Sequence, residues 1–294
     1  MRTFSHPGYK RFLLSVGCLL SIHFTALFFL TLFRLVFFFS ANYDFPDQEH
    51  VGFMSIWPAF IRGVWFDNVI ACYILLIPLV AVSISALFNY YGKILWNVTC
   101  IFFSLFYGIV LLVTAANIPY FQYFFKIINS SVFNWFGYMN TTAGMVFGET
   151  SYYPPLIGFL LTLVLFIWLM RRLIRHFQRL LNTKNPSVFW LDRIYIFLTA
   201  GICIGLCLFG IRGRTGYNPI KVSAAYYCTD PFLNQLGISP VFNLLSSTLD
   251  DSRKENRYLH LMPENEALEN TRHYLNRPGI EGISPIARQI NASD

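Results

Sequence analysis

Two arginines flanked by glycines are the residues that most clearly suggest chemistry. Arg212 and Arg214 lie in the stretch Gly210-Ile-Arg-Gly-Arg-Thr-Gly216. A guanidinium holds phosphate through its planar fork, and glycine lets a backbone come close to a ligand. The pattern predicts contact with the phosphate of an anionic lipid, with Asn218 as a further headgroup candidate. Simple anchoring at the membrane surface is the alternative.

A second group of charged and aromatic side chains lies in Phe60–Asp67, where a long apolar stretch begins. Arg62 and Trp65 are residue types found at the headgroup level, and with Asp67 they are further headgroup candidates. Arg34 lies near the end of the preceding apolar stretch, and a charged side chain is rare in such a stretch. It can extend its side chain to the membrane surface, or it can form an ion pair with Asp67.

The segment Asn117–Tyr138 is rich in aromatic side chains and holds one charged residue, Lys126. It is too polar to cross a membrane and too apolar to lie in water, so we expect a short helix in the headgroup layer. In one interpretation, this helix only anchors the protein through its aromatic side chains. Alternatively, it forms one wall of a headgroup site with Asn117, Tyr120 and Phe121.

Signatures of soluble enzyme chemistry are missing from the sequence. It holds no Walker loop, no G-x-G-x-x-G, no H-E-x-x-H, no G-x-S-x-G and no C-x-x-C. The histidines are scattered, and none has a second ligand at metal spacing. Most cysteines lie inside apolar stretches, which argues against an extracellular disulfide framework. We therefore expect neither a metal site nor catalytic residues within these 294 residues.

The composition indicates that the elements carrying these residues lie in a membrane. Of 294 residues, 55% are hydrophobic and 13% are charged, and the mean hydropathy is +0.49. A soluble domain carries about 25% charged residues. A water-soluble globule and a disordered chain are both excluded. The net charge of +7 does not point to nucleic acid, because in a membrane protein the distribution of basic residues matters more than their sum.

Five apolar stretches are long enough, or nearly so, to cross the hydrocarbon core of a bilayer. A helix needs about 20 mainly apolar residues to do so. The predicted spans cover residues 12–39, 69–88, 94–116, 154–171 and 193–210. They contain few polar residues at mid-membrane, which argues against a small transporter.

Lysine and arginine residues are divided unevenly between the two sides of these spans. Up to the fifth span, ten lie on the side of the N-terminus and two on the opposite side. Cytoplasmic flanks are enriched in Lys and Arg, so we predict a cytoplasmic N-terminus. Five spans then place the C-terminus on the extracytoplasmic side.

Beyond residue 210 the sequence predicts short helices rather than another span. In residues 211–249, a helix-capping side chain precedes a proline three times, at Asn218-Pro219, Asp230-Pro231 and Ser239-Pro240. Residues 250–294 are charged and form a predicted extracytoplasmic linker. The expected helices cover residues 219–228, 231–236, 240–249 and 264–275. The predicted fold is an all-α five-span bundle with interfacial helices on its outer face and a short helical linker.

These features together resemble the membrane domain of the lipoteichoic acid synthase and phosphoglycerol transferase family, of the alkaline phosphatase and sulfatase superfamily. The likeness rests on the five spans, the outside tail and three stretches: Phe60–Asp67, Asn117–Phe124 and Gly213–Pro219. The tail from Asn234 to Asn243, with the helix near Glu264, is similar to the linker of that family. The likeness covers essentially the whole chain.

The resemblance implies a catalytic domain beyond Asp294, at the outer face of a bacterial cytoplasmic membrane. In similar proteins that domain uses a threonine and a divalent metal, manganese or magnesium, to transfer phosphoglycerol from phosphatidylglycerol. No position here can be matched to those catalytic residues. The expected function is to anchor such an enzyme and present its anionic lipid. The alternative is a stand-alone membrane scaffold that recruits an extracytoplasmic protein. No nucleic-acid partner is expected.

Overall fold

The computed structural model describes residues 6–41, 53–181, 190–253 and 262–275. Its five long helices are α1 (Pro7–Ser40), α2 (Phe53–Leu87), α3 (Lys93–Phe124), α5 (Tyr153–Leu181) and α6 (Trp190–Arg212). Each is long and apolar enough to cross a membrane, and the described residues contain no strand. The prediction of an all-α, multi-pass membrane protein is therefore confirmed.

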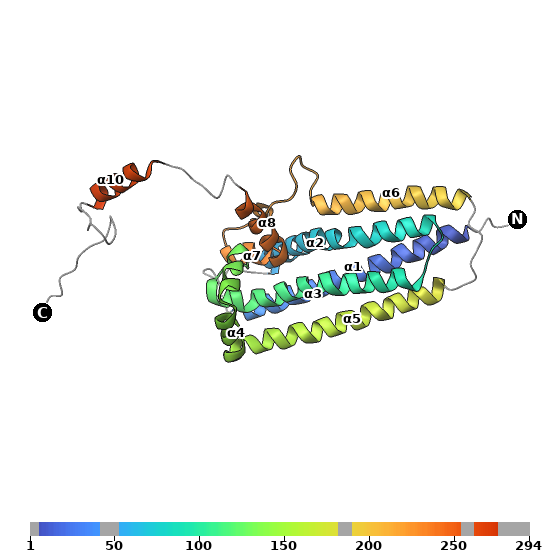
Figure 1. The fold of residues 1–294 in the computed structure, drawn as a ribbon, viewed down its shortest axis with the longest axis horizontal. Coiled ribbons are helices and arrows are strands. Elements are labelled where there is room, and N and C mark those ends of the chain that lie inside the picture. Colours follow the sequence, from blue (N-terminus) through green and yellow to red (C-terminus); the bar gives the residue numbers. More distant parts are fainter. Residues whose placement is uncertain (1–5, 42–52, 182–189, 254–261, 276–294) are drawn as a thin grey trace. The chain divides into compact units, whose positions relative to one another are not determined.

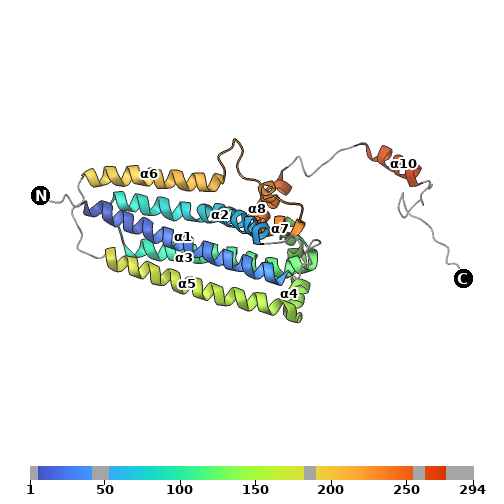
Figure 2. The same ribbon diagram turned by 180° about the vertical axis from the view of Figure 1, so that it is seen from behind.

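The helix α1 lies at the centre of the bundle. It contacts each of the other four long helices, whereas α6 packs mainly on α2 and α5 mainly on α3. Figures 1 and 2 show α1 between α2 and α5 from both sides. The core is built from large apolar side chains of these helices, among them Phe12, Phe103 and Phe166.

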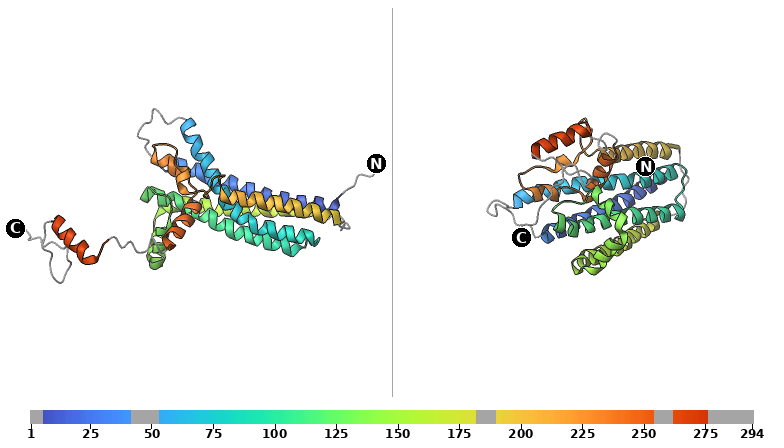
Figure 3. Two further views of the ribbon diagram at one scale, coloured as in Figure 1. Left: turned by 90° about the horizontal axis from the view of Figure 1, so that it is seen from above. Right: turned by 60° about the vertical axis from the view of Figure 1, so that its left-hand side comes forward.

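We call the end of the bundle at Ser40, Phe53 and Phe124 the capped end, because the short helix α7 (Pro231–Leu236) packs there against α1 and α2. Asp230 caps α7, since its carboxylate accepts a hydrogen bond from the Leu233 amide at 2.8 Å. At this end, the first turns of α2 point away from the direction in which the other long helices run (Figure 3).

The third long helix does not end where the apolar stretch ends. Residues 117–124 were expected outside the span, in an interfacial helix, but they continue α3 to Phe124. The reason is packing, because Asn117 and Phe121 lie one turn apart and are both buried. Phe125 then adopts a left-handed conformation with φ 53° and ends the helix.

Short helices follow at the capped end, and one prediction there is wrong. The aromatic segment continues as η1 (Ser130–Tyr138), α4 (Met139–Gly148) and η2 (Thr150–Tyr152). Residues 219–228 do not form the expected helix, and only the single turn η3 (Val222–Ala225) is helical. The Ile220 amide donates to the Arg212 carbonyl at 3.0 Å, which folds this segment back on α6 instead.

The last helices follow the sequence prediction closely. The helix α8 runs over Pro240–Ser252 and α10 over Glu264–Leu275, with Glu264 and Glu266 in the first turn of α10. Residues 1–248 and 249–294 form two separate compact units. Every described side chain of α10 is at least partly exposed.

Candidate functional site

Arg34 and Asp67 form a buried ion pair at the capped end. Nη2 of Arg34 donates to Oδ2 of Asp67 at 2.6 Å, and the two residues are 5% and 2% exposed. Nη1 of Arg34 donates to the carbonyls of Leu236 and Ile238, the second at 3.1 Å. The structure thus brings together the two residues that the sequence suggested as partners. Their burial removes Asp67 from the set of headgroup contacts.

Gly63 makes room for this pair. A Cβ atom at this position would lie 2.1 Å from the guanidinium carbon of Arg34, so any larger residue would displace the arginine. Packing against Arg34 therefore explains why the stretch Phe60–Asp67 contains a glycine. It lets the backbone of α2 lie directly against a charged side chain of α1.

Arg62 packs on the α7 side of the capped end. Its guanidinium lies over the ring of Tyr227, 4.4 Å from the ring centre. The Tyr227 hydroxyl donates to the Ser55 carbonyl at 2.6 Å, and burial raises the pKa of this phenol well above its ordinary value. Arg62 is thus half-buried against protein and oriented by an aromatic ring. It holds the segment after η3 against α2.

The three candidate headgroup residues on α3 differ in how accessible their side chains are. Asn117 is 1% exposed, and its Oδ1 accepts a hydrogen bond from the Ile128 amide at 3.0 Å. Phe121 is also 1% exposed and packs on Phe37. Neither side chain can reach a headgroup, because both are enclosed by protein. Tyr120 remains partly accessible and lines a cavity described below.

Arg212 is the last residue of α6, and Arg214 lies in the loop that follows it. Nη2 of Arg212 donates to the carbonyls of Gly216 and Tyr217, the second at 2.8 Å, so this arginine closes the loop. Gly213 has φ +71°, a left-handed conformation that favours glycine and permits the sharp turn. Arg214 is exposed, and the structure gives it no hydrogen-bond or ion-pair partner among the described residues. Asn218 is exposed on the same loop.

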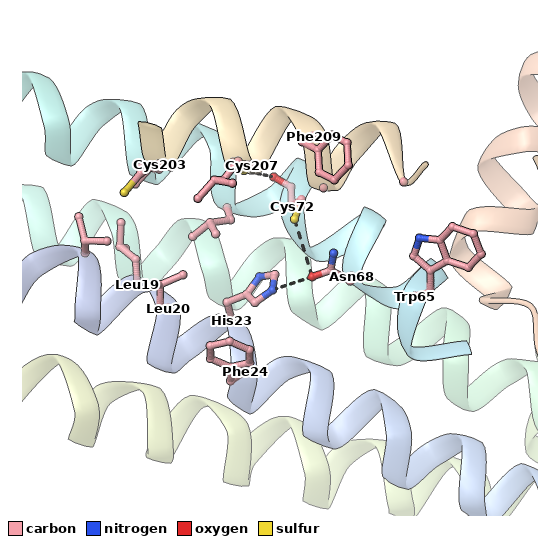
Figure 4. A pocket seen from close by; sticks show the side chains of 16 residues that line it. Leu19, Leu20, His23, Phe24, Trp65, Asn68, Cys72, Cys203, Cys207 and Phe209 are labelled. Carbon is pink, nitrogen blue, oxygen red and sulfur yellow. Dashed lines mark hydrogen bonds between the residues drawn. The ribbon is translucent and has the colours of Figure 1, made fainter. Parts of the chain in front are cut away.

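A groove of about 400 Å³ runs between α1, α2 and α6 and reaches this loop (Figure 4). On α2 its lining extends from Trp65 to Leu79, and on α6 from Cys203 to Gly210, with Gly213 just beyond the end of that helix. Most of the lining is apolar. Its inner walls include Val16, Leu19, Leu20, Phe24, Leu75 and Leu206.

A small polar cluster interrupts the apolar wall near the loop. Nε2 of His23 lies 3.0 Å from Oδ1 of Asn68, and because that oxygen only accepts, Nε2 donates. The Cys72 thiol faces the same oxygen at 3.9 Å (Figure 4). Sequence reasoning missed His23 and Asn68. The signal was a polar side chain near the centre of one apolar stretch and another near the start of the next.

The groove and its mouth at the capped end have a shape and lining that suit a bound ligand. The described residues contain no group of three or more His, Cys, Asp or Glu side chains that could hold a metal ion. Trp65 at the mouth of the groove is 37% exposed, which leaves its ring available to a ligand. An apolar groove that ends beside an exposed arginine fits a molecule with a long chain and an anionic head.

No protein-family model matches this chain, and no curated protein or solved structure is significantly similar to it.

Proposed function

We propose that this protein holds an anionic membrane lipid and presents it at the capped end, as the membrane module of a phosphoglycerol-transferase-like or sulfatase-like enzyme. The observation that carries the proposal is the groove between α1, α2 and α6, which ends at Gly213 beside the exposed Arg214. The groove supplies a place for a chain, and the arginine supplies a partner for a phosphate.

The dimensions of the groove suit one leaflet of a bilayer. Its lining covers seven residue steps on α6, from Cys203 to Gly210, and fourteen on α2, from Trp65 to Leu79, or about 11 Å and about 21 Å at the helical rise. Half of a hydrocarbon core of about 30 Å lies between these two lengths. A lipid with its phosphate at the loop would therefore lay one acyl chain along the groove within its own leaflet.

The two arginines of the loop have different roles in this proposal. Arg212 is already engaged by two backbone carbonyls, so it shapes the loop. Arg214 is the side chain that binds the phosphate, with Trp65 at the headgroup level beside the groove. This assignment narrows the headgroup candidates to Arg214, Trp65 and Asn218.

The orientation of the lipid follows from the distribution of basic residues. Up to the fifth span, ten lysines and arginines flank the spans on the side of the N-terminus and two on the capped side. We infer that the capped end faces away from the cytoplasm of a bacterial cell and that the lipid lies in the outer leaflet. The resemblance to the lipoteichoic acid synthase family supports phosphatidylglycerol as the lipid. It also supports a catalytic domain as the recipient.

The module acts by position. A lipid held by its chain and phosphate is confined near the capped end, which raises its effective concentration for a catalytic group on the same side. No step of bond making is assigned to the residues of this chain.

The test compares phosphatidylglycerol binding by the purified protein and two arginine variants in detergent. Arg214→Ala removes a charge-assisted contact, so we expect affinity to fall roughly tenfold. Arg171→Ala is the matched control and should change the affinity little. It removes an exposed arginine from the half of α5 that lies away from the capped end. Phosphatidylcholine, in which the choline cation offsets the charge of the phosphate, should lose less affinity on Arg214→Ala than phosphatidylglycerol does. Equal affinity of the Arg214 and Arg171 variants for phosphatidylglycerol would overturn the proposal.

A further inference from the structure

A second cavity lies on the other side of the bundle. It has a volume of about 670 Å³ and is formed by α3, η1, α4 and α5. Its floor on α3 includes Ala115, Ala116 and Tyr120, and its opposite wall on α5 includes Leu156 and Phe159. No residue of the groove between α1, α2 and α6 contributes to it.

Aromatic rings form one continuous wall of this cavity. The ring centres of Tyr120 and Phe124 are 4.7 Å apart, and Trp135 lies 5.8 Å from the first and 5.7 Å from the second. Such spacings are those of favourable ring packing, so the three side chains support one another. They close the cavity on the η1 side with an apolar surface of mutually tilted rings.

The polarity of the lining excludes charged and strongly polar ligands. None of the lining residues is charged. The Thr142 hydroxyl lies 3.1 Å from the Tyr138 carbonyl, to which it donates, and the Tyr120 hydroxyl donates to Asn129 at 3.4 Å. A carboxylate inside the cavity would have no counter-charge among the lining residues, so a charged head group must stay outside. An uncharged aliphatic chain fits inside.

The cavity lies where lipid chains are present. It is built around the ends of α3 and α5 at the capped end, and α5 keeps most of its apolar surface exposed. In a bilayer that surface faces acyl chains. A chain can therefore enter the cavity from the side while its headgroup stays outside, at the membrane surface.

We propose that this cavity binds one acyl chain of a membrane phospholipid, separate from any lipid held beside Arg214. The inference rests on the membrane location of the bundle and not on the proposed function. The protein then has two chain-binding sites on opposite sides of α1, and each reaches the capped end.

The experiment uses phosphatidylcholine with a photoreactive acyl chain, bound to the full-length protein in nanodiscs. After illumination, the labelled residues are mapped by peptide mass spectrometry. We expect labels on residues 112–124 of α3 and on residues 152–159. Ala116→Phe fills the cavity. Excluding two methylenes of the acyl chain from the cavity should lower this labelling roughly tenfold.

Three further variants make the result decisive. Ile109→Phe adds the same side chain to α3 at an exposed position outside the cavity, and it should leave labelling unchanged. Leu156→Trp fills the cavity from the opposite wall and should reproduce the loss seen with Ala116→Phe. Leu206→Trp obstructs only the groove, so it should reduce labelling of α6 and spare α3 and α5. Labels spread evenly over α3 and α5, and unaffected by both filling variants, would overturn the inference.

Discussion

Replacing Asp67 with asparagine removes one charge from the pair at the capped end and leaves Arg34 buried. The two side chains are almost inaccessible to solvent, and the contact between them is 2.6 Å. Loss of one partner from a buried pair costs about 3–5 kcal/mol, because the remaining charge is uncompensated. Arg34 keeps the carbonyls of Leu236 and Ile238 as acceptors, which favours the lower end of that range.

The assay is equilibrium unfolding of the purified protein in mixed detergent micelles, followed by far-ultraviolet circular dichroism. Asp250→Asn is the matched control, because Asp250 pairs with Arg253 at 3.5 Å on an exposed helix surface. Loss of an exposed pair should cost less than about 1 kcal/mol. Arg34→Lys should fall between the two variants, since an ammonium cannot reproduce the guanidinium fork.

The outcome separates two descriptions of the capped end. If Asp67→Asn loses no more stability than Asp250→Asn, then Arg34 and Asp67 are solvated in the folded protein. The account of the capped end as a desolvated, charge-paired contact would then be wrong.

Three other predictions concern the same end of the bundle. Gly63→Ala should destabilise the protein by about 1–3 kcal/mol in the same unfolding assay, because its methyl group overlaps Arg34. Asn117→Leu should cost about 1–3 kcal/mol, since it leaves the Ile128 amide buried without an acceptor. The raised pKa of Tyr227 means that the folded protein retains this proton more strongly than the unfolded chain. Its contribution to stability should therefore be complete below about pH 10, the ordinary tyrosine value, and should decline above it.

Each of these has an internal control. Combining Gly63→Ala with Arg34→Ala should lose less than the sum of the single variants, because the overlap disappears with the arginine. Asn117→Asp keeps an oxygen acceptor and should retain more stability than the leucine variant. The decline above pH 10 should become shallower in Tyr227→Phe, and an unchanged pH profile in that variant would contradict the role given to the phenol.

The five spans could be predicted from the sequence for a simple reason, whereas the ion pair was one of two alternatives that the sequence left open for Arg34. Apolar stretches of sufficient length predict membrane helices directly. Arg34 and Asp67 face each other because α1 and α2 pack along each other. The structure begins α2 at Phe53, so Asp67 lies well inside that helix and not at its start. Few other charges were available to either Arg34 or Asp67, so residue type alone narrowed the choice.

Backbone partners could not be foreseen in this way. Arg212 binds the carbonyls of Gly216 and Tyr217, and Asn117 accepts from the amide of Ile128. Every residue has a carbonyl and all except proline have an amide, so no residue type marks these positions. The same holds for the two hollows beside α1. They depend on how side-chain volumes fail to fill the space between helices, which a pattern of apolar residues does not encode.

The position of Arg34 also sets an order of assembly. Its acceptor on α2 is made 33 residues later, and its first carbonyl acceptor 202 residues later. During translation, the guanidinium can therefore complete its contacts only after all five spans have been synthesised. A nascent chain that stalls between residues 212 and 236 would contain the five long helices described here and still leave this arginine short of acceptors. Closure of the α7 segment is thus a late event in biogenesis, and it marks a finished bundle.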